Sequence, residues 1–395
     1  MLDNHFPSPF SWISLAARIS ALALMLLISS MLPGCASPQS QVTPSSFAAA
    51  SSPTLDEKIG QMLMIGFRGM EVDDDHFIVQ DIKHRNLGGV ILFDYDAISA
   101  KHKRNVELRA QVKTLIYRLQ RAATIPLFVA VDQEGGRVAR LHVRYGFPPT
   151  RSHMDLGKQD DLRLTLTETT ALATTLAEVG FNLNMAPVVD LCSNPDNPVI
   201  AAYERCFSSE PQKVTEHALS YIAAHHQHGV LTTLKHFPGH GSSEDDSHLG
   251  LTDVTHSWSE SELLPYQRII AAGQADLVMT AHVFNAQLDP EYPATLSRSI
   301  IDGLLRQQLG YDGVVISDDM QMGAIVDYYG FETALGLAIT AGVDILIFGN
   351  NLQYDEHIVP HTIATIKKLI HAGTLSEARI DQAYRHIMQL KSRLN

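Results

Sequence analysis

The chain contains the stretch Gly229-Val-Leu-Thr-Thr-Leu-Lys-His-Phe-Pro-Gly-His-Gly241, in which an apolar run leads directly into polar residues. The run from Gly229 to Leu234 is typical of a strand that is buried on both faces. Glycine and proline at positions 238, 239 and 241 bend the backbone and indicate an irregular loop. Packing gives no reason for a lysine and two histidines at the end of a buried strand. The stretch therefore predicts a functional loop on a rigid scaffold.

Seven further apolar runs are spaced along the chain, and stretches with helical periodicity separate them. This alternation over about 340 residues predicts an α/β fold, a (β/α)8 TIM-type barrel formed by a single catalytic domain at 55–395. A doubly wound open sheet is the alternative. Helices are expected at about 100–122, 168–179 and 380–390. The predicted strands are 61–67, 89–93, 126–132, 181–187, 229–234, 276–282, 313–319 and 343–349.

Polar side chains gather where these strands end, which favours the barrel because barrel active sites lie at the C-terminal ends of the strands. They are Asp132 and Glu134, Asp190 and Asn194, Lys235 and His236, His282, and Asp318 and Asp319. Beside Asp132, a Gly-Gly bend and the arginines Arg137 and Arg140 suit hydrogen bonding to a polyhydroxylated ligand. A structural ion pair is an equal alternative.

Asp318 and Asp319 are adjacent carboxylates at the end of a buried strand, which is costly unless they are used or neutralised. Successive strand residues face opposite ways, so one of the two is expected to point into a pocket. The pattern leaves open which one, and a helix N-cap is the alternative role for either.

Asp246-Ser247-His248 is a second candidate site. Asp246 is placed to hold the imidazole of His248 and fix its tautomer, which would make a general acid/base. A surface Asx turn with a solvated histidine is the alternative. His236 and His240 have the spacing of a zinc pair on a helix, but Pro238 opposes a helix, so neither a metal nor a cofactor is expected.

The composition is that of a globular protein, with 395 residues, 45% hydrophobic and 18% charged. The formal net charge is −13, and the sequence has no dense cluster of lysine and arginine. A nucleic-acid partner is therefore not expected, and the acidity argues for solubility.

The sequence predicts a signal peptide at 1–34. Its mostly apolar run at 19–32 has about the length of a signal-peptide core and is too short to span a bilayer comfortably. Leu32-Pro-Gly-Cys35 resembles a bacterial lipoprotein signal, which implies cleavage before Cys35 and lipid on its sulfur. An uncleaved anchor is the alternative. Ala36 resembles the signal for outer-membrane sorting, so the periplasmic side of the outer membrane is the expected location. Residues 35–54 read as the lipidated cysteine and a flexible tether.

The other two of the three cysteines, Cys192 and Cys206, lie 14 residues apart, and the expected compartment permits disulfides. A bridge between them would stabilise the fold by roughly 3 kcal/mol. Two buried thiols are the alternative.

Together these residues resemble glycoside hydrolase family 3, and specifically its single-domain bacterial β-N-acetylhexosaminidases. The resemblance spans about residues 55–350. It is carried by Val131-Asp-Gln-Glu-Gly-Gly-Arg137, Asn197-Pro-Val-Ile200, Arg205-Cys-Phe207, Lys235-His-Phe-Pro-Gly-His-Gly241, Asp246-Ser-His248 and Ser317-Asp-Asp-Met320.

The resemblance implies a retaining exo-hydrolase that removes terminal, non-reducing β-linked N-acetylglucosamine from peptidoglycan fragments or chitin-type oligosaccharides. It implies that Asp318 is the nucleophile of a covalent glycosyl-enzyme, that His248 is the acid/base and that Asp246 supports His248. The residues it implies for binding the terminal sugar are Asp132, Arg140, Arg205, Lys235 and His236.

One position departs from the family pattern: many members carry an aspartate after the glycine that matches Gly241, and this chain has Ser242. We expect that change to alter the local turn rather than the reaction. The expected partners are an oligosaccharide and, through the lipid, a membrane, and a monomer is expected. The alternatives are a family 3 β-glucosidase, a glycoside phosphorylase and a non-catalytic cell-wall-binding lipoprotein.

Overall fold

The computed structural model of the protein describes residues 52–246 and 250–394. Its centre is a closed barrel of eight strands, in the order β1-β12-β11-β9-β7-β6-β5-β2, and every neighbouring pair is parallel. The predicted (β/α)8 barrel is confirmed, and the open sheet is wrong because β1 pairs with both β2 and β12. The strands are β1 Leu63–Gly66, β2 Gly89–Leu92, β5 Phe128–Val131, β6 Leu183–Asn184, β7 Leu231–Phe237, β9 Leu277–Thr280, β11 Val314–Asp319 and β12 Ile345–Phe348.

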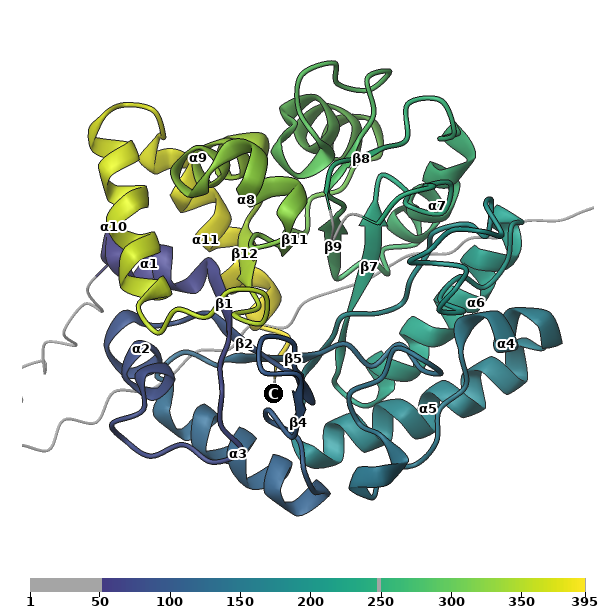
Figure 1. Ribbon diagram of the computed structural model, residues 1–395, viewed down its shortest axis with the longest axis horizontal. Helices are drawn as coiled ribbons and strands as arrows, with labels where there is room; N and C mark the ends of the chain where they lie inside the picture. The colour runs from purple at the N-terminus through teal and green to yellow at the C-terminus, as the bar shows by residue number, and fades with distance from the viewer. Residues whose placement is uncertain (1–51, 247–249, 395) are drawn as a thin grey trace, which may run out of the picture. The chain divides into compact units, whose positions relative to one another are not determined.

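The helices surround the strands (Figure 1). Residues of β1, β2, β5, β6, β7, β9 and β12 are all buried, because the barrel interior covers one face of each strand and the helices cover the other. The helices are α1 Leu55–Gln61, α2 Phe77–Arg85, α3 Arg109–Ala122, α4 His153–Gln159, α5 Leu162–Val179, α6 Pro211–Gln227, α7 Leu264–Ala271, the π-helix η4 Ser299–Gln308, α8 Gly323–Tyr329, α9 Phe331–Ala341, α10 Ile358–His371 and α11 Glu377–Lys391.

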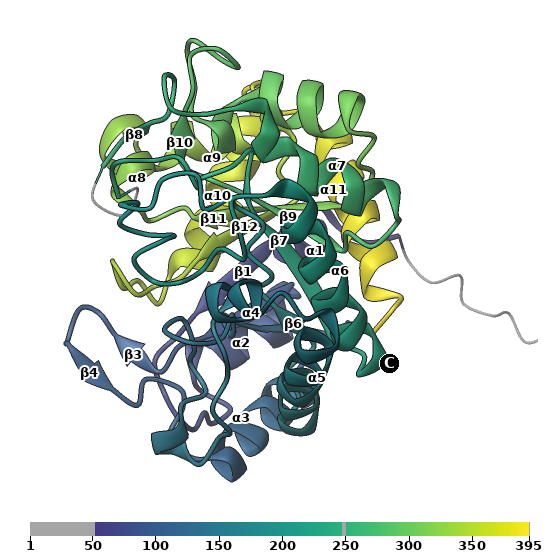
Figure 2. The same cartoon turned by 90° about the vertical axis from the view of Figure 1, so that its right-hand side faces the viewer.

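The helix expected at about 100–122 begins only at Arg109, so the first part of that prediction is wrong. The two short strands β3 Tyr95–Asp96 and β4 Lys101–His102 form a hairpin there, which stands out from the barrel in Figure 2. The carboxylate of Asp96 ties the hairpin down: it accepts hydrogen bonds from the Ser99 amide at 2.8 Å and from Arg104 at 3.0 Å. Helical periodicity could not reveal these contacts.

Strand β7 is longer than expected and ends at Phe237. Its pairing with β9 shifts register between Leu234 and Phe237, so Lys235 and His236 lie in an irregular part of the strand at the barrel rim. Such irregularities re-aim side chains next to active sites. The predicted irregular loop follows from Pro238 onwards.

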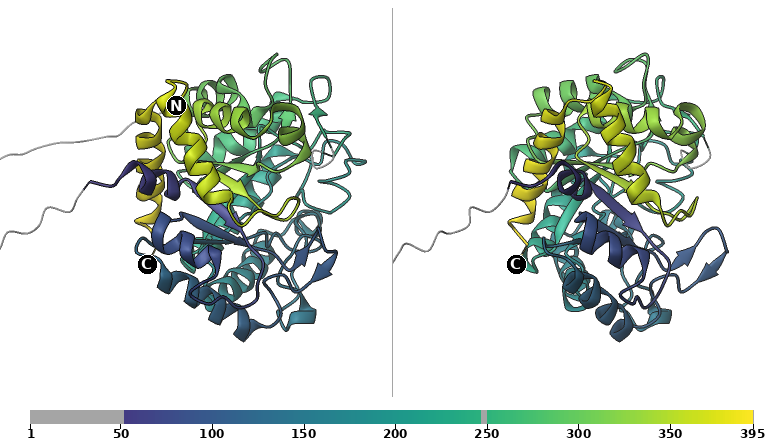
Figure 3. Two further views of the ribbon diagram at one scale, coloured as in Figure 1. Left: turned by 60° about the vertical axis from the view of Figure 1, so that its left-hand side comes forward. Right: turned by 90° about the vertical axis from the view of Figure 1, so that its left-hand side faces the viewer.

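The closing helix α11 packs beside α1, as both views of Figure 3 show. Lys58 of α1 contacts Asp381 of α11 at 2.6 Å, and Lys391 donates to the Gln61 side chain at 2.7 Å. Among residues 52–246 and 250–394, no helix has the length and apolar character needed to cross a membrane. The predicted signal peptide, lipidated Cys35 and most of the tether lie outside the described residues.

Candidate active site

Four of the five residues expected to bind a sugar come from segments at the C-terminal ends of β5 and β7. Asp132 follows β5 directly, Arg140 lies in the loop after it, and Lys235 and His236 lie in β7. Arg205 comes from the long segment between β6 and α6. The structure brings all five together in one network of hydrogen bonds and ion pairs.

Glu134 is the centre of this network, and its side chain is only 1% exposed. Arg205 donates two hydrogen bonds to its two oxygens, each at 2.8 Å, and Lys235 Nζ contacts Oε1 at 2.8 Å. Burial alone raises the pKa of Glu134, but Arg205 and Lys235 outweigh burial and hold the pKa well below its ordinary value. Glu134 is therefore a carboxylate at neutral pH, and its role is to hold two cations in place.

Asp132 and Arg140 form the more open part of the network, with side chains 17% and 27% exposed. Lys235 Nζ donates to Asp132 Oδ1 at 2.9 Å, and Arg140 Nη2 lies 3.6 Å from Oδ2. Burial raises the pKa of Asp132, but Lys235 and Arg140 hold it below its ordinary value. The Nε of Arg140 is buried and has no hydrogen-bond partner among the described residues. The exposed parts of the Asp132 carboxylate and the Arg140 guanidinium offer an acceptor and a donor to a polyhydroxylated ligand.

His236 is held in one tautomer by its two neighbours. Arg205 Nη2 donates toward the His236 Nε2 at 3.1 Å, so the ring proton sits on Nδ1, which donates to Asp190 Oδ2 at 2.7 Å. Asp190 Oδ1 accepts from the backbone amides of His236 at 3.1 Å and His240 at 2.9 Å. Burial raises the pKa of Asp190, and His236 lowers it below the ordinary value. Asp190 thus fixes both the imidazole and the loop that carries it.

The segment that carries Arg205 is clamped at both of its sides. Cys192 and Cys206 are joined by a disulfide with a Cα–Cα distance of 5.5 Å. The Asn197 side chain donates to the carbonyl of His240 at 2.8 Å and accepts from the amide of Ile200 at 2.7 Å. These contacts attach the segment to the loop after β7 and so position Arg205.

Asp318 and Asp319 have different surroundings. Asp319 Oδ1 accepts from the amides of Gln321 at 3.0 Å and Gly349 at 3.1 Å, so it joins the end of β11 to the end of β12. The next helix, α8, has Met322 at its N-cap position, so the alternative that either aspartate is its N-cap is wrong. The amide of Asp319 donates to Asp318 Oδ1 at 2.8 Å. Asp319 therefore has a structural role, which leaves Asp318 as the candidate for chemistry.

Asp246 is half-buried, in the loop that follows β7. His248, its predicted partner, lies outside the described residues, so their pairing stays a prediction. Within residues 52–246 and 250–394, no group of three or more histidine, cysteine, aspartate or glutamate side chains is arranged to hold a metal ion.

Sequence reasoning missed Glu262, which lies in the 3-10 helix η2 Glu260–Leu263 and is buried beneath the Asp190 loop. It accepts hydrogen bonds from the Leu191 amide and the Ser193 hydroxyl, both at 3.0 Å. The Ser-Glu-Ser-Glu pattern at 259–262 is typical of an exposed helix start, so the sequence held no signal for a buried carboxyl.

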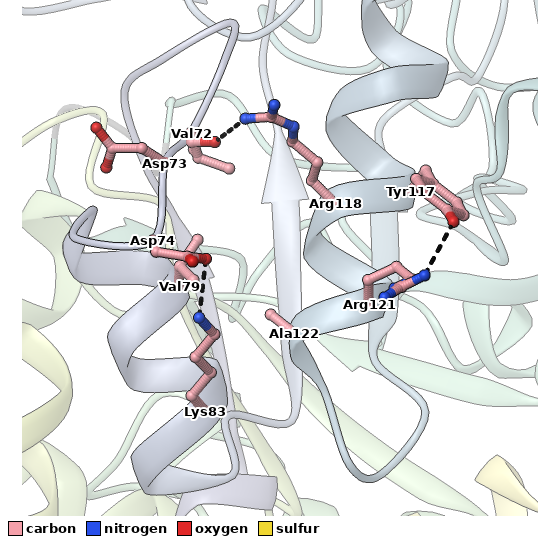
Figure 4. A pocket seen from close by; sticks show the side chains of 9 residues that line it. All are labelled: Val72, Asp73, Asp74, Val79, Lys83, Tyr117, Arg118, Arg121 and Ala122. Atoms are coloured by element: carbon pink, nitrogen blue, oxygen red, sulfur yellow. Dashed lines mark hydrogen bonds and ion pairs between the residues drawn. The ribbon is translucent and has the colours of Figure 1, made fainter.

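A cavity of about 490 Å³ lies away from these residues, between α2 and α3 (Figure 4). Two ion or hydrogen-bond contacts lie within the cavity: Lys83 contacts Asp74 at 2.8 Å, and Arg118 donates to the carbonyl of Val72 at 2.8 Å. None of the predicted site residues lines it.

Comparison with known proteins places the chain in a family. The model of the Glycosyl hydrolase family 3 N terminal domain matches residues 54–390. Beta-hexosaminidase A of Pseudoalteromonas piscicida is 35% identical over 338 residues, which are 79% of this chain and 54% of that protein. The chain thus spans about half the length of this relative. The Beta-hexosaminidase of Tolumonas auensis is 35% identical over 292 residues, which are 73% of this chain and 83% of that protein.

Solved structures agree with this assignment. A glycoside hydrolase family 3 beta-N-acetylglucosaminidase from Paenibacillus is 35% identical with a TM-score of 0.78, covering 87% of this chain and 63% of that chain. A Beta-N-acetylhexosaminidase from Beutenbergia cavernae is 29% identical with a TM-score of 0.76, covering 87% of this chain and 100% of that chain. The barrel, the motifs at its rim and a family model that covers most of the chain lead to one conclusion: the protein belongs to glycoside hydrolase family 3.

Proposed function

We propose that this family 3 protein is a retaining exo-β-N-acetylhexosaminidase. Its substrates are terminal, non-reducing β-linked N-acetylglucosamine units of peptidoglycan fragments or chitin-type oligosaccharides. The observation that carries the proposal is the buried network in which Lys235 contacts both Asp132 and Glu134 at the barrel rim. The names of the β-hexosaminidase relatives support it.

In this proposal the network binds the terminal sugar. Asp132 accepts hydrogen bonds from hydroxyl groups of the sugar ring, and Lys235 and Arg140 donate hydrogen bonds to oxygen atoms of the sugar. Lys235 is 3% exposed and Arg205 13% exposed, so both are already fixed by protein contacts before a sugar arrives. Little side-chain ordering is then left for binding, which favours affinity. His236, held by Asp190, completes the sugar contacts.

The proposed reaction has two steps. The Asp318 carboxylate attacks the anomeric carbon and forms a covalent ester, while the glycosidic bond breaks and its oxygen takes a proton from His248. A water molecule then gives a proton to His248 and attacks the same carbon, which releases the sugar and regenerates the Asp318 carboxylate. Two inversions retain the configuration. Asp246 holds the His248 ring in this scheme.

The first test compares two aryl β-glycosides, the N-acetylglucosaminide and the glucoside, in the presence of a chelator and with or without phosphate. We expect turnover of the N-acetyl substrate alone, unchanged by phosphate. Turnover of the glucoside would point to a β-glucosidase, and release of sugar 1-phosphate to a phosphorylase. If folded protein turns over neither substrate, the binding-lipoprotein alternative replaces this proposal.

Two variants test the roles of the residues. Asp318→Ala is expected to abolish turnover and to keep the wild-type melting temperature within a few degrees; full activity would contradict the nucleophile assignment. His248→Ala is expected to keep most activity on substrates with very good leaving groups, because these need no proton, and to lose natural substrates. Equal loss on both would argue against a general acid.

We also propose that the mature protein starts at a lipidated Cys35 and is attached to the periplasmic side of the outer membrane. Cys35→Ser is expected to move the protein from the membrane fraction to the soluble periplasmic fraction. An unchanged distribution and an unchanged mass of the N-terminal peptide would contradict the lipid anchor.

A further inference from the structure

Glu262 is a buried carboxyl group that the proposed reaction does not use. It comes from η2, just before α7, and its residue is 1% exposed. Its two donors, the Leu191 amide and the Ser193 hydroxyl, are both uncharged. In the described part of the chain it forms no ion pair, whereas Glu134 and Asp190 each face a cation or an imidazole.

The side chain of Glu262 lies between two loops. On one side it contacts the loop after β6 through Leu191 and Ser193. On the other side lie Gly239 and Gly241: a methyl group on Gly239 would collide with the Glu262 side chain, and one on Gly241 would reach within 3.0 Å of its Oε1. Gly239 makes room for Glu262, and Gly241 makes room chiefly for the carbonyl oxygen of Leu191, so the three segments are packed as one unit.

This unit carries two groups of the sugar-binding network. Leu191, whose amide Glu262 holds, directly follows Asp190. Asp190 in turn holds the ring of His236 at 2.7 Å and the amide of His240 at 2.9 Å. A shift of the 190–193 backbone would therefore move His236 and the loop that leads to Asp246.

The surroundings of Glu262 favour its neutral form. Burial is the larger cause, and the Asp190 carboxylate adds to it, which together raise the pKa of Glu262 to about 8. From α7, Tyr266 faces it as a neutral phenol, because burial raises the pKa of that tyrosine well above its ordinary value. From the loop after β7, burial lowers the pKa of His240 to about 4, so that imidazole adds no positive charge at neutral pH.

We propose that Glu262 is a positioning residue whose neutral carboxylic acid joins the loops after β6 and β7 and thereby keeps Asp190 and His236 in place. In this form Oε2 accepts a hydrogen bond from the Leu191 amide. Oε1 carries the acid proton and forms the hydrogen bond with the Ser193 hydroxyl. Ionisation places a second negative charge beside Asp190 and loosens the two loops. The proposal rests on the proposed function only in that His236 contacts the sugar there.

The test uses Glu262→Gln, which has the same shape and is neutral at every pH, with Glu260→Gln as the matched control from the exposed side of the same helix η2. Rates on the aryl N-acetylglucosaminide are measured between pH 5 and pH 10. We expect kcat/KM of the wild type and of the control to fall above pH 8, mainly through a rise in KM. The Glu262→Gln variant is expected to keep its pH 7 values within about threefold and to lack this fall.

Two results would overturn the proposal. One is a folded Glu262→Gln protein that loses more than about thirtyfold in kcat/KM at pH 7, because the site would then need the charged carboxylate. The other is a fall in kcat/KM above pH 8 that is the same in all three proteins.

If the wild type does not hydrolyse the substrate at all, the proposed function fails, and infrared difference spectra between wild type and Glu262→Gln decide about Glu262 by themselves. A protonated carboxyl band at pH 7 that disappears above pH 8 supports the proposal. The absence of such a band at pH 7 overturns it.

Discussion

Glu134→Gln removes the charge at the centre of the buried network and keeps its volume. Glu134 holds Arg205 through two hydrogen bonds and Lys235 through one contact, all at 2.8 Å. The glutamine amide would turn a donor toward one of these cations, which leaves both arginine and lysine with less counter-charge in a buried site.

The size of the effect follows from these contacts. A hydrogen bond to a charged group contributes about 1.5–3 kcal/mol, and removing one partner of a buried ion pair costs about 3–5 kcal/mol. Since Asp132 still faces Lys235 at 2.9 Å, we expect the free energy of unfolding to fall by about 4 kcal/mol, the middle of the range for a broken buried ion pair. With an unfolding entropy of about 2.1 cal/mol/K per residue, a domain of this size loses roughly 6 °C in Tm for that change.

Urea unfolding and calorimetry measure the change, and Glu332→Gln is the matched control. Glu332 contacts Lys368 at the same distance, 2.8 Å, but the two side chains are 46% and 68% exposed. Exposed pairs contribute about 0–1 kcal/mol, so the control should stay within that range of the wild type.

The pH dependence of stability provides a second test of the contacts that Glu134 makes. The pKa of Glu134 is lower in the folded protein than its ordinary value of 4.5. The stability that this carboxylate contributes is therefore complete above pH 4.5 and is lost as the pH falls toward the folded pKa. The difference between wild type and Glu134→Gln should shrink in acid. A difference below about 1 kcal/mol at pH 7, or one that acid leaves unchanged, would refute this account of the network.

Two further predictions concern the scaffold. Replacing both Cys192 and Cys206 with alanine should lower the free energy of unfolding by roughly 3 kcal/mol, and reductant should lower that of the wild type but not of the variant; equal stability with and without the bridge would contradict this. Gly66→Ala should cost about 2 kcal/mol or more, because its methyl group meets the carbonyl oxygen of Gly349, directly after β12. Gly303→Ala, where nothing lies within 4 Å, should be neutral or stabilising by up to about 1 kcal/mol, and equal losses at both positions would contradict the steric reason.

The strands were predictable because burial on both faces of a parallel strand demands an uninterrupted apolar run. All eight predicted runs overlap a barrel strand, from β1 at Leu63–Gly66 to β12 at Ile345–Phe348. Helix boundaries were harder. α5 begins at Leu162 rather than at about 168, because the Asp161 side chain caps it through the Arg163 amide at 2.9 Å. A cap depends on one side-chain hydrogen bond, which periodicity does not register.

The candidate residues were visible as types that packing does not explain, and the motifs around Asp132, Lys235 and Asp318 already indicated family 3. Their partners were not visible. Glu134, Asp190 and Glu262 are three buried carboxyl groups; the pKa is lowered for Glu134 and Asp190 and raised for Glu262, and nothing in their sequence surroundings separates them. Burial and the nearest charge decide the pKa of each, and both are properties of the folded chain.

The sequence by itself determined the order of strands and helices and the chemical groups that end the strands, because these depend on local hydrophobicity and residue type. Only the tertiary structure decided which groups meet. Closure of the barrel through β1 and β12 places the ends of β5, β7 and β11 on one rim, and Asp319 is engaged there by Gly349 of the neighbouring strand end. The physical reason is that hydrogen bonding and electrostatics act over a few ångströms in space, whatever the separation along the chain.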